Sequence, residues 1–386
     1  MEKNSFSPLS FLASLGAGGI AVVPFAFFQY TYHTGKGLIT FNQIDHFSLP
    51  LLQQLLFYAL EIVMVVFAII HFVLTYQNTK ELIGWVKTKE YEKLFNDPLK
   101  NAGIMATFLS YFMTMNVFIG PIRFFIPFMS KNLQATMLPA LIVGGILWAL
   151  MMRMEIKLLK TSFVKSFDVS KIHFGWLLHP FALAMGTVTL TGIAAMSKTP
   201  NIAHTAASLA FISGSMAFFL LIVKLISIFK SHFAAEGLPD KQFLPSMLIV
   251  VPIITLLAIS GFRLGHYFER QLGFHTEFLE FAIIAFSFAF ETWYLMFGLA
   301  LLKDYFKKHF FKKEYYITQW GLICPFVAYA VLGSFLYELY IPSPFLYGLI
   351  LVSFVTAIAL FSLILSRHIN CRLSKKTGTT TVSCYS

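Results

Sequence analysis

Four basic side chains lie within long apolar stretches of the sequence or at the ends of such stretches: Arg123, His179, Arg263 and His266. A charged side chain inside a bilayer costs roughly 2.5–3.5 kcal/mol on insertion scales, so each is a candidate for a functional site. Positive side chains along a path through a membrane would attract and concentrate anions. The alternative for the arginines and His266 is snorkelling towards water. The alternative for His179 is a hydrogen bond to a neighbouring helix.

Aromatic side chains beside prolines form a second set of candidates. Phe25, Phe181 and Phe326 each directly follow a proline, and Cys324 directly precedes Pro325. If phenylalanine rings project inward at one level, they form an apolar constriction, which can gate a channel by dewetting. The alternative for each ring is packing behind the bend in its own helix.

The composition indicates that these residues are positioned by membrane helices. The chain is 57% hydrophobic and 12% charged, with a mean hydropathy of +0.72, whereas soluble domains carry about a quarter charged residues. About 20 apolar residues in a helix span a bilayer. Ten such stretches nearly use up the chain and leave no room for a sizeable soluble domain. We expect them at residues 9–31, 51–76, 102–126, 134–154, 173–197, 203–229, 244–266, 277–302, 317–339 and 343–366.

The basic residues predict the orientation of these spans. If the N-terminus is cytoplasmic, nearly all Lys and Arg residues outside the spans fall on the inner side, and this bias predicts an even number of spans with both termini in the cytoplasm. The exceptions on the outer side are Lys36, Lys131, Lys198, Arg263 and Arg270. Topology therefore explains most of the net charge of +11, and nucleic-acid binding is not expected. We predict a transmembrane domain over residues 1–366 and a polar, disordered cytoplasmic tail over residues 367–386.

Interior prolines recur in the odd-numbered spans, whereas prolines in the even-numbered spans lie towards an end or are absent. The interior prolines are Pro24, Pro121, Pro180, Pro252 and Pro325. A proline inside a helix removes a backbone hydrogen bond and bends the helix. Short outer loops pair the spans into five antiparallel hairpins. The alternation then predicts an inner ring of five kinked odd helices around a pore and an outer ring of five even helices. The alternative is the general frequency of proline in membrane helices.

This architecture resembles that of the tellurite-resistance/dicarboxylate transporter family, which includes TehA and the plant slow anion channels. The local match is "WGLICPF" in the ninth span, where Trp320 lies five residues before Pro325. The resemblance implies a homotrimer in which each protomer has its own pore for small inorganic or organic anions such as nitrate, chloride, sulfite or malate. It also implies a gate at the residue directly before the ninth-span proline. That residue is phenylalanine in the family and Cys324 here, with Phe326 after the proline.

We therefore expect transport of small anions across the plasma membrane (the cell's inner membrane) through a central pore with an aromatic constriction, by a channel or uniporter. A proton-coupled transporter of an oxyanion or C4-dicarboxylate is the alternative, and a membrane receptor or assembly subunit without permeation is a third. Enzymatic activity is not expected, because the sequence has no nucleophile elbow, P-loop or HExxH motif. No cofactor or metal is expected either, since Cys324, Cys371 and Cys384 lack zinc-type spacing.

Overall fold

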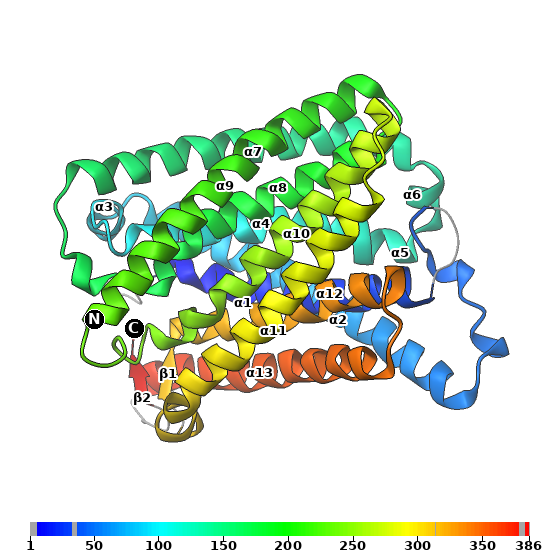
Figure 1. Cartoon of the computed structure of the whole chain (residues 1–386). Coiled ribbons are helices and arrows are strands. Elements are labelled where there is room, and N and C mark those ends of the chain that lie inside the picture. Colours follow the sequence, from blue (N-terminus) through cyan, green and yellow to red (C-terminus); the bar gives the residue numbers. More distant parts are fainter. Residues whose placement is uncertain (1–5, 33–36, 313, 378–382, 386) are drawn as a thin grey trace.

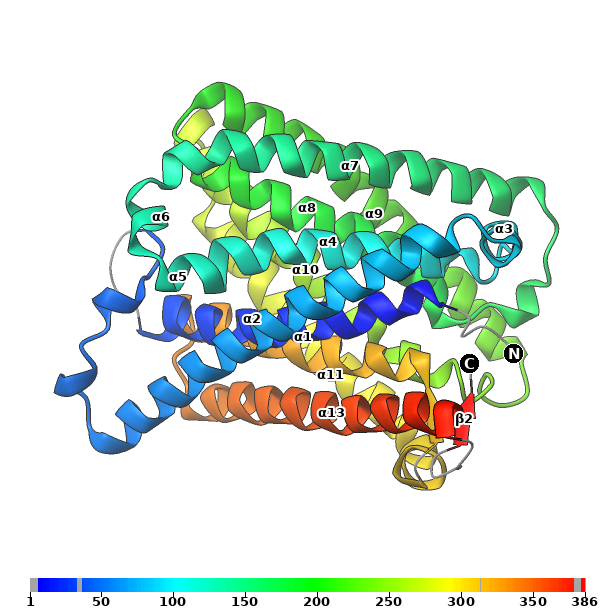
Figure 2. The same cartoon turned by 180° about the vertical axis from the view of Figure 1, so that it is seen from behind.

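The computed structural model describes residues 6–32, 37–312, 314–377 and 383–385, and nearly all of their regular structure is helical. Ten helical segments among these residues are long and apolar enough to cross a membrane. They coincide with the ten predicted stretches, which confirms the prediction of an all-α membrane protein. The two chain ends lie at the same end of the bundle, together with the short helix α3 (Lys89–Phe95), as expected for an even number of spans (Figure 1; Figure 2).

The five even-numbered spans are uninterrupted α-helices that extend beyond the predicted stretches. In the most apolar 18-residue stretch of each of these helices, only 22–39% of the residues are buried, so much of the apolar surface faces outwards. A helix that is apolar on its outward face is typical of a membrane span. These helices are α2 (Leu51–Trp85), α7 (Leu133–Val164), α9 (Pro200–Ala234), α11 (Glu277–Lys308) and α13 (Pro344–Thr377).

The five odd-numbered spans are more deeply buried: in the corresponding 18-residue stretches, 61–100% of the residues are buried. Their helices are also irregular. Each begins with a 3₁₀ segment that continues into an α-helix. The α-helices are α1 (Phe11–Phe27), α4 (Ala106–Val117), α8 (Leu178–Met196), α10 (Val250–Tyr267) and α12 (Ile323–Leu339). The preceding 3₁₀ segments are Pro8–Ser10, Asn101–Met105, Phe174–Leu177, Leu244–Ile249 and Ile317–Leu322. Three of the spans, the first, third and seventh, also contain a π-helical turn after the α-helix: Phe28–Tyr32, Phe118–Ile122 and Phe268–Leu272.

The prolines of the odd spans lie where the helix type changes, and the prediction of five mid-helix kinks is wrong for three of them. Pro180, Pro252 and Pro325 are each the third residue of an α-helix. The first backbone N–H groups of an α-helix have no partner within the helix, so proline removes little there. Pro24 lies inside α1, one turn before its π-helical segment, and Pro121 lies within a π-helical turn.

The odd and even spans differ in their neighbours. The contacts α1–α4, α4–α8, α8–α10, α10–α12 and α12–α1 close a cycle of odd spans. Each even span packs against the odd span before it in the chain: α2 on α1, α7 on α4, α9 on α8, α11 on α10 and α13 on α12. In both views these helices run alongside one another through the length of the bundle (Figure 1; Figure 2).

Several short elements lie at the two ends of the bundle. The short helices α5 (Arg123–Phe125) and α6 (Pro127–Lys131) follow the third span at the end opposite the chain termini. At the terminal end, β1 (Glu314–Tyr316) pairs in parallel with β2 (Ser383–Tyr385). The tail predicted from residue 367 onwards thus contains regular structure, because α13 continues past residue 366 to Thr377. Its first residue also packs against the bundle, since the guanidinium of Arg367 lies 4.4 Å from the centre of the Phe310 ring.

Candidate functional site

Two cavities lie inside the cycle of odd spans. The central cavity, of about 150 Å³, is lined by residues of all five odd spans, including Val22, Asn116, Met185, Thr255 and Val327. The vestibule, of about 330 Å³, lies at the terminal end, and the first residues of the same five spans contribute to its wall. Among the described residues that line these two cavities, none comes from α2, α7, α9, α11 or α13.

The two cavities meet at two side chains. Phe181 in the first turn of α8 and Cys324 in the first turn of α12 are the residues that line both the central cavity and the vestibule. Both side chains are almost fully buried, with 2% and 7% of their surface exposed. An aromatic ring and a thiol are therefore the side chains that the two cavity linings have in common.

The other predicted gate residues lie elsewhere. Phe25 lines the central cavity, where its ring contacts the position of Gly120: a Cβ atom there would lie 3.0 Å from the ring. Phe326 lines neither cavity. On α12 the lining side chains include Cys324 and Val327, at helical spacing, so Phe326 falls on another face. The Phe326 carbonyl accepts a hydrogen bond from Ser353 on the outer helix α13.

Arg263 is the one charged side chain among the described residues that line the central cavity. Its Nη1 donates a hydrogen bond to the carbonyl of Val188, at 2.7 Å. No carboxylate in the described ranges forms an ion pair with it. The space for the guanidinium comes from Gly192, where a Cβ atom would lie 3.2 Å from Nη1. Asn116 and Thr255 supply neutral polar groups to the same cavity, so the lining combines one positive side chain with two neutral polar ones.

Arg123 has a different environment from the one predicted, because its charge does not face the central cavity. Its Nε donates to the carbonyl of Ile119, at 2.8 Å, and its Nη2 donates to the carbonyl of Ile39, at 2.9 Å. Its Nη1 donates to Ser130 Oγ and to the carbonyl of Leu38. The side chain is fully buried. These bonds hold the loop after the first span against the third span, a structural role.

His179 and His266 each face a carboxylate that the sequence reasoning missed. His179 Nδ1 lies 2.7 Å from Oε2 of Glu155 on α7, and His266 Nδ1 lies 3.3 Å from Oε1 of Glu280 on α11. Glu155 directly follows the predicted fourth span, at residues 134–154, so a wider search at span ends would have found it. The buried amine of Lys224 lies on the ring of Trp176, at 4.2 Å, and is close enough to Glu155 to interact with its charge.

Two titratable residues outside the spans, His173 and Lys100, line the vestibule. His173 stacks on Phe243 with ring centres 3.8 Å apart, and its Nδ1 accepts a hydrogen bond from the Gly175 N–H. Burial, together with the nearby charge of Lys100, lowers the pKa of His173 to about 4. At neutral pH the imidazole is therefore uncharged, and Lys100 supplies positive charge to the vestibule wall.

The comparison with family models agrees with this arrangement. The model of the family SLAC1, voltage-dependent anion channel, matches residues 5–369, almost the whole chain. A comparison with curated proteins finds no match. The family resemblance drawn from the ten spans and the ninth-span segment is confirmed by this match. The chain therefore belongs to the voltage-dependent anion channel family, whose members are multi-pass channels or transporters that move anions across a membrane.

Proposed function

We propose that the central cavity and the vestibule form one conduction path for small anions, enclosed by a ring of α1, α4, α8, α10 and α12. The single observation that carries this proposal is that both cavities are lined by the odd spans and share Phe181 and Cys324 as their boundary. These two side chains form the constriction, and Phe181 supplies its aromatic part. An apolar constriction of this kind excludes water until the ring moves or an ion is driven past it.

The electrostatics of the path favour anions. Arg263 contributes a positive charge without a carboxylate partner in the described residues, and Lys100 contributes another at the vestibule. The five odd spans run in the same direction, so their N-terminal segments meet at the vestibule. The N-terminus of a helix carries roughly half a positive charge, which favours anions. Cations would meet like charges at both ends of the path.

The orientation and assembly belong to the same proposal. The positive-inside bias of the sequence puts the vestibule and both termini on the cytoplasmic side of the plasma membrane. Each protomer encloses a complete path within one ring of helices, so the homotrimer implied by the family resemblance would contain three separate paths. The volumes of the cavities suit small anions such as chloride or nitrate as well as small organic anions.

The experiment is anion flux into liposomes that contain the purified full-length chain, with chloride, nitrate, sulfite and malate tested in turn. Phe181→Ala and the milder Phe181→Leu should both raise the flux, because each removes part of the ring at the junction. Phe326→Ala is the matched control on the face of α12 that lines neither cavity, and it should leave the flux unchanged. No flux of any of these anions in the wild type and in either Phe181 variant would overturn the proposal.

A proton-coupled transporter is the second candidate, and one observation favours it. The buried cluster of Glu155, His179 and Lys224 lies behind the constriction, since His179 is two residues from Phe181 on α8. Protons that bind such a cluster would change the charge beside the helix that carries the ring. The two mechanisms differ in coupling: an imposed anion gradient that drives protons uphill in the liposomes would support the transporter, and a flux independent of the pH gradient would support the channel.

A further inference from the structure

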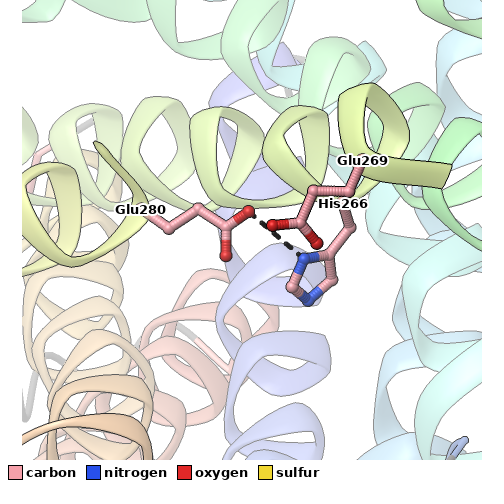
Figure 3. Close-up of side chains that lie close together, drawn as sticks. All are labelled: His266, Glu269 and Glu280. Carbon is pink, nitrogen blue, oxygen red and sulfur yellow. Dashed lines mark ion pairs between the residues drawn. The ribbon is translucent and has the colours of Figure 1, made fainter. Parts of the chain in front are cut away.

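A cluster of three metal-ligating side chains lies at the end of the bundle opposite the termini. His266 is on α10, Glu269 is on the π-helical turn that follows it, and Glu280 is on the first turns of α11 (Figure 3). One donor atom from each residue lies within 4.8 Å of the other two. We call this group the His/Glu cluster. It is separate from the conduction path, because none of the three side chains lines the central cavity or the vestibule.

The local structure holds the donors together. A Cβ atom at Gly265 would collide with the carboxylate of Glu280, so glycine at this position lets α11 bring that carboxylate against α10. The hydroxyl of Thr276 lies 2.8 Å from Oε1 of Glu280 and 3.3 Å from Oε1 of Glu269. One hydroxyl thus bridges both carboxylates from behind, the kind of outer partner that orients metal ligands.

The cluster has more negative than positive charge. The Nδ1 atom of His266 is buried and lies 3.3 Å from Oε1 of Glu280, with which it forms an ion pair (Figure 3). Glu280 is 5% exposed. Burial and then the charges of Glu280, Glu269 and Glu277 raise the pKa of the neighbouring Tyr340 to about 12. Negative charge therefore accumulates here, with a single imidazole opposite it.

We propose that His266, Glu269 and Glu280 form a binding site for a divalent transition-metal ion of the zinc class. One imidazole nitrogen and two carboxylate oxygens are a donor set that Zn²⁺ accepts, at about 2.0–2.2 Å from the metal. The two carboxylates match the double positive charge. Mg²⁺ and Ca²⁺ prefer oxygen ligands only, so the nitrogen favours a transition metal over them.

The position of the site links the metal to the conduction path. The ring of His266 lies 4.5 Å from that of Phe262, which contacts Phe335 at 5.3 Å. Phe335 lines the central cavity, and its ring contacts that of Tyr30, another lining residue, with the ring centres 3.8 Å apart. Two carboxylates near this end of the central cavity offset part of the positive charge that Arg263 supplies to the path, and a bound divalent cation would remove that offset. This regulatory consequence rests on the proposed function, whereas metal binding itself does not.

The test of binding is calorimetric titration of the purified full-length chain with Zn²⁺, after treatment with a chelator. We expect one site per chain, and a loss of affinity of at least about tenfold in His266→Gln and in Glu280→Gln. The matched controls are His275→Gln and Glu277→Gln, exposed residues of the same loop and helix start that are outside the cluster; they should bind as the wild type does. Co²⁺ should give a visible absorption spectrum that depends on His266.

Three outcomes would overturn the site: no stoichiometric binding in the folded wild type, equal affinity in the His266 and His275 variants, or binding of Mg²⁺ as tight as that of Zn²⁺. The thermal unfolding of each variant shows whether it is folded. In liposomes, Zn²⁺ on the outer side should raise anion flux in the wild type and not in His266→Gln. Zn²⁺ binding without any anion flux would contradict the proposed function and leave the metal site standing. Flux without Zn²⁺ binding would do the reverse.

Discussion

The Nδ1 atom of His179 lies 2.7 Å from Oε2 of Glu155, and neither side chain is exposed to solvent. This contact joins the outer helix α7 to α8, two residues before Phe181 at the proposed constriction. The other carboxylate oxygen, Oε1, and the other ring nitrogen, Nε2, have no hydrogen-bond partner in the described residues. The pair is buried beside the amine of Lys224, which is close enough to Glu155 to interact with its charge, and it ties α8 to the outer helix α7.

Glu155→Gln should destabilise the protein. Removing one partner of a buried charged pair typically costs about 3–5 kcal/mol, because the other partner is left buried without compensation. The measurement is thermal unfolding of the purified chain in detergent. Glu277→Gln, which removes a carboxylate from an exposed position, should leave the unfolding temperature unchanged. Equal unfolding temperatures for the wild type and Glu155→Gln would show that the pair does not stabilise the fold.

Cys324→Phe should reduce anion flux strongly. A second aromatic ring at the boundary between the central cavity and the vestibule fills the space that the thiol leaves beside Phe181. Cys324→Ala is the control, since it adds no volume and should conduct at least as well as the wild type. The anion flux of Cys324→Phe is compared with that of Cys324→Ala in the liposome assay. If Cys324→Phe conducts like the wild type, Phe181 and Cys324 do not form the constriction.

The long apolar stretches were sufficient to predict the ten spans, because a bilayer imposes a length and a composition on each of them. The 3₁₀ starts of the odd spans were not predictable in this way. An apolar stretch has the same composition whether its first turn is 3₁₀ or α, and a proline near that turn fits both an interior kink and a helix start. The structure decides, for example, that Pro325 is the third residue of α12.

Some of the residues predicted for the site line the central cavity, and others lie elsewhere. Phe25, Phe181, Cys324 and Arg263 line the central cavity, whereas Arg123 and Phe326 do not. The partners of Arg123 are backbone carbonyls of Leu38 and Ile39, far from it in the sequence. Backbone carbonyls leave no mark in the residue types, so this structural role could not be recognised. The orientation of Phe326 depends on the rotation of α12, which a uniformly apolar helix does not reveal.

Arg263→Gln should change anion flux, whereas Arg123→Gln should change the stability of the fold. A unit charge contributes roughly 2–3 kcal/mol to an anion about 6 Å away at an effective dielectric constant of about 20. Arg263→Gln should therefore lower anion flux and weaken the preference for anions over cations, with little change in unfolding temperature. Arg123→Gln should lower the unfolding temperature, because the loop carbonyls that it binds lose their donors. Flux and unfolding are measured on the same preparations. Equal flux in Arg263→Gln and the wild type would contradict the role of this charge.

The stability of the protein should fall as the pH is lowered from about 6.5 to about 4, and His173 should cause part of this fall. Burial lowers the pKa of His173 from 6.5 to about 4 in the folded protein, with smaller contributions from the charges of Lys100 and His232, while Asp97 acts in the opposite direction. The unfolded chain therefore binds the proton more readily than the folded chain does. The contribution of the neutral His173 to the free energy of unfolding is therefore complete above pH 6.5 and is lost as the pH falls towards 4.

His173→Asn isolates this effect, because asparagine does not titrate but can still accept the hydrogen bond from the Gly175 N–H at the start of the helix. Thermal unfolding of both proteins is measured across this pH range. The wild type should lose of the order of 2 kcal/mol more than the variant between pH 6.5 and 4, since one pKa unit corresponds to about 1.4 kcal/mol. Parallel pH profiles would mean that His173 is protonated equally easily in the folded and unfolded chains, and that the vestibule does not exclude water from its ring.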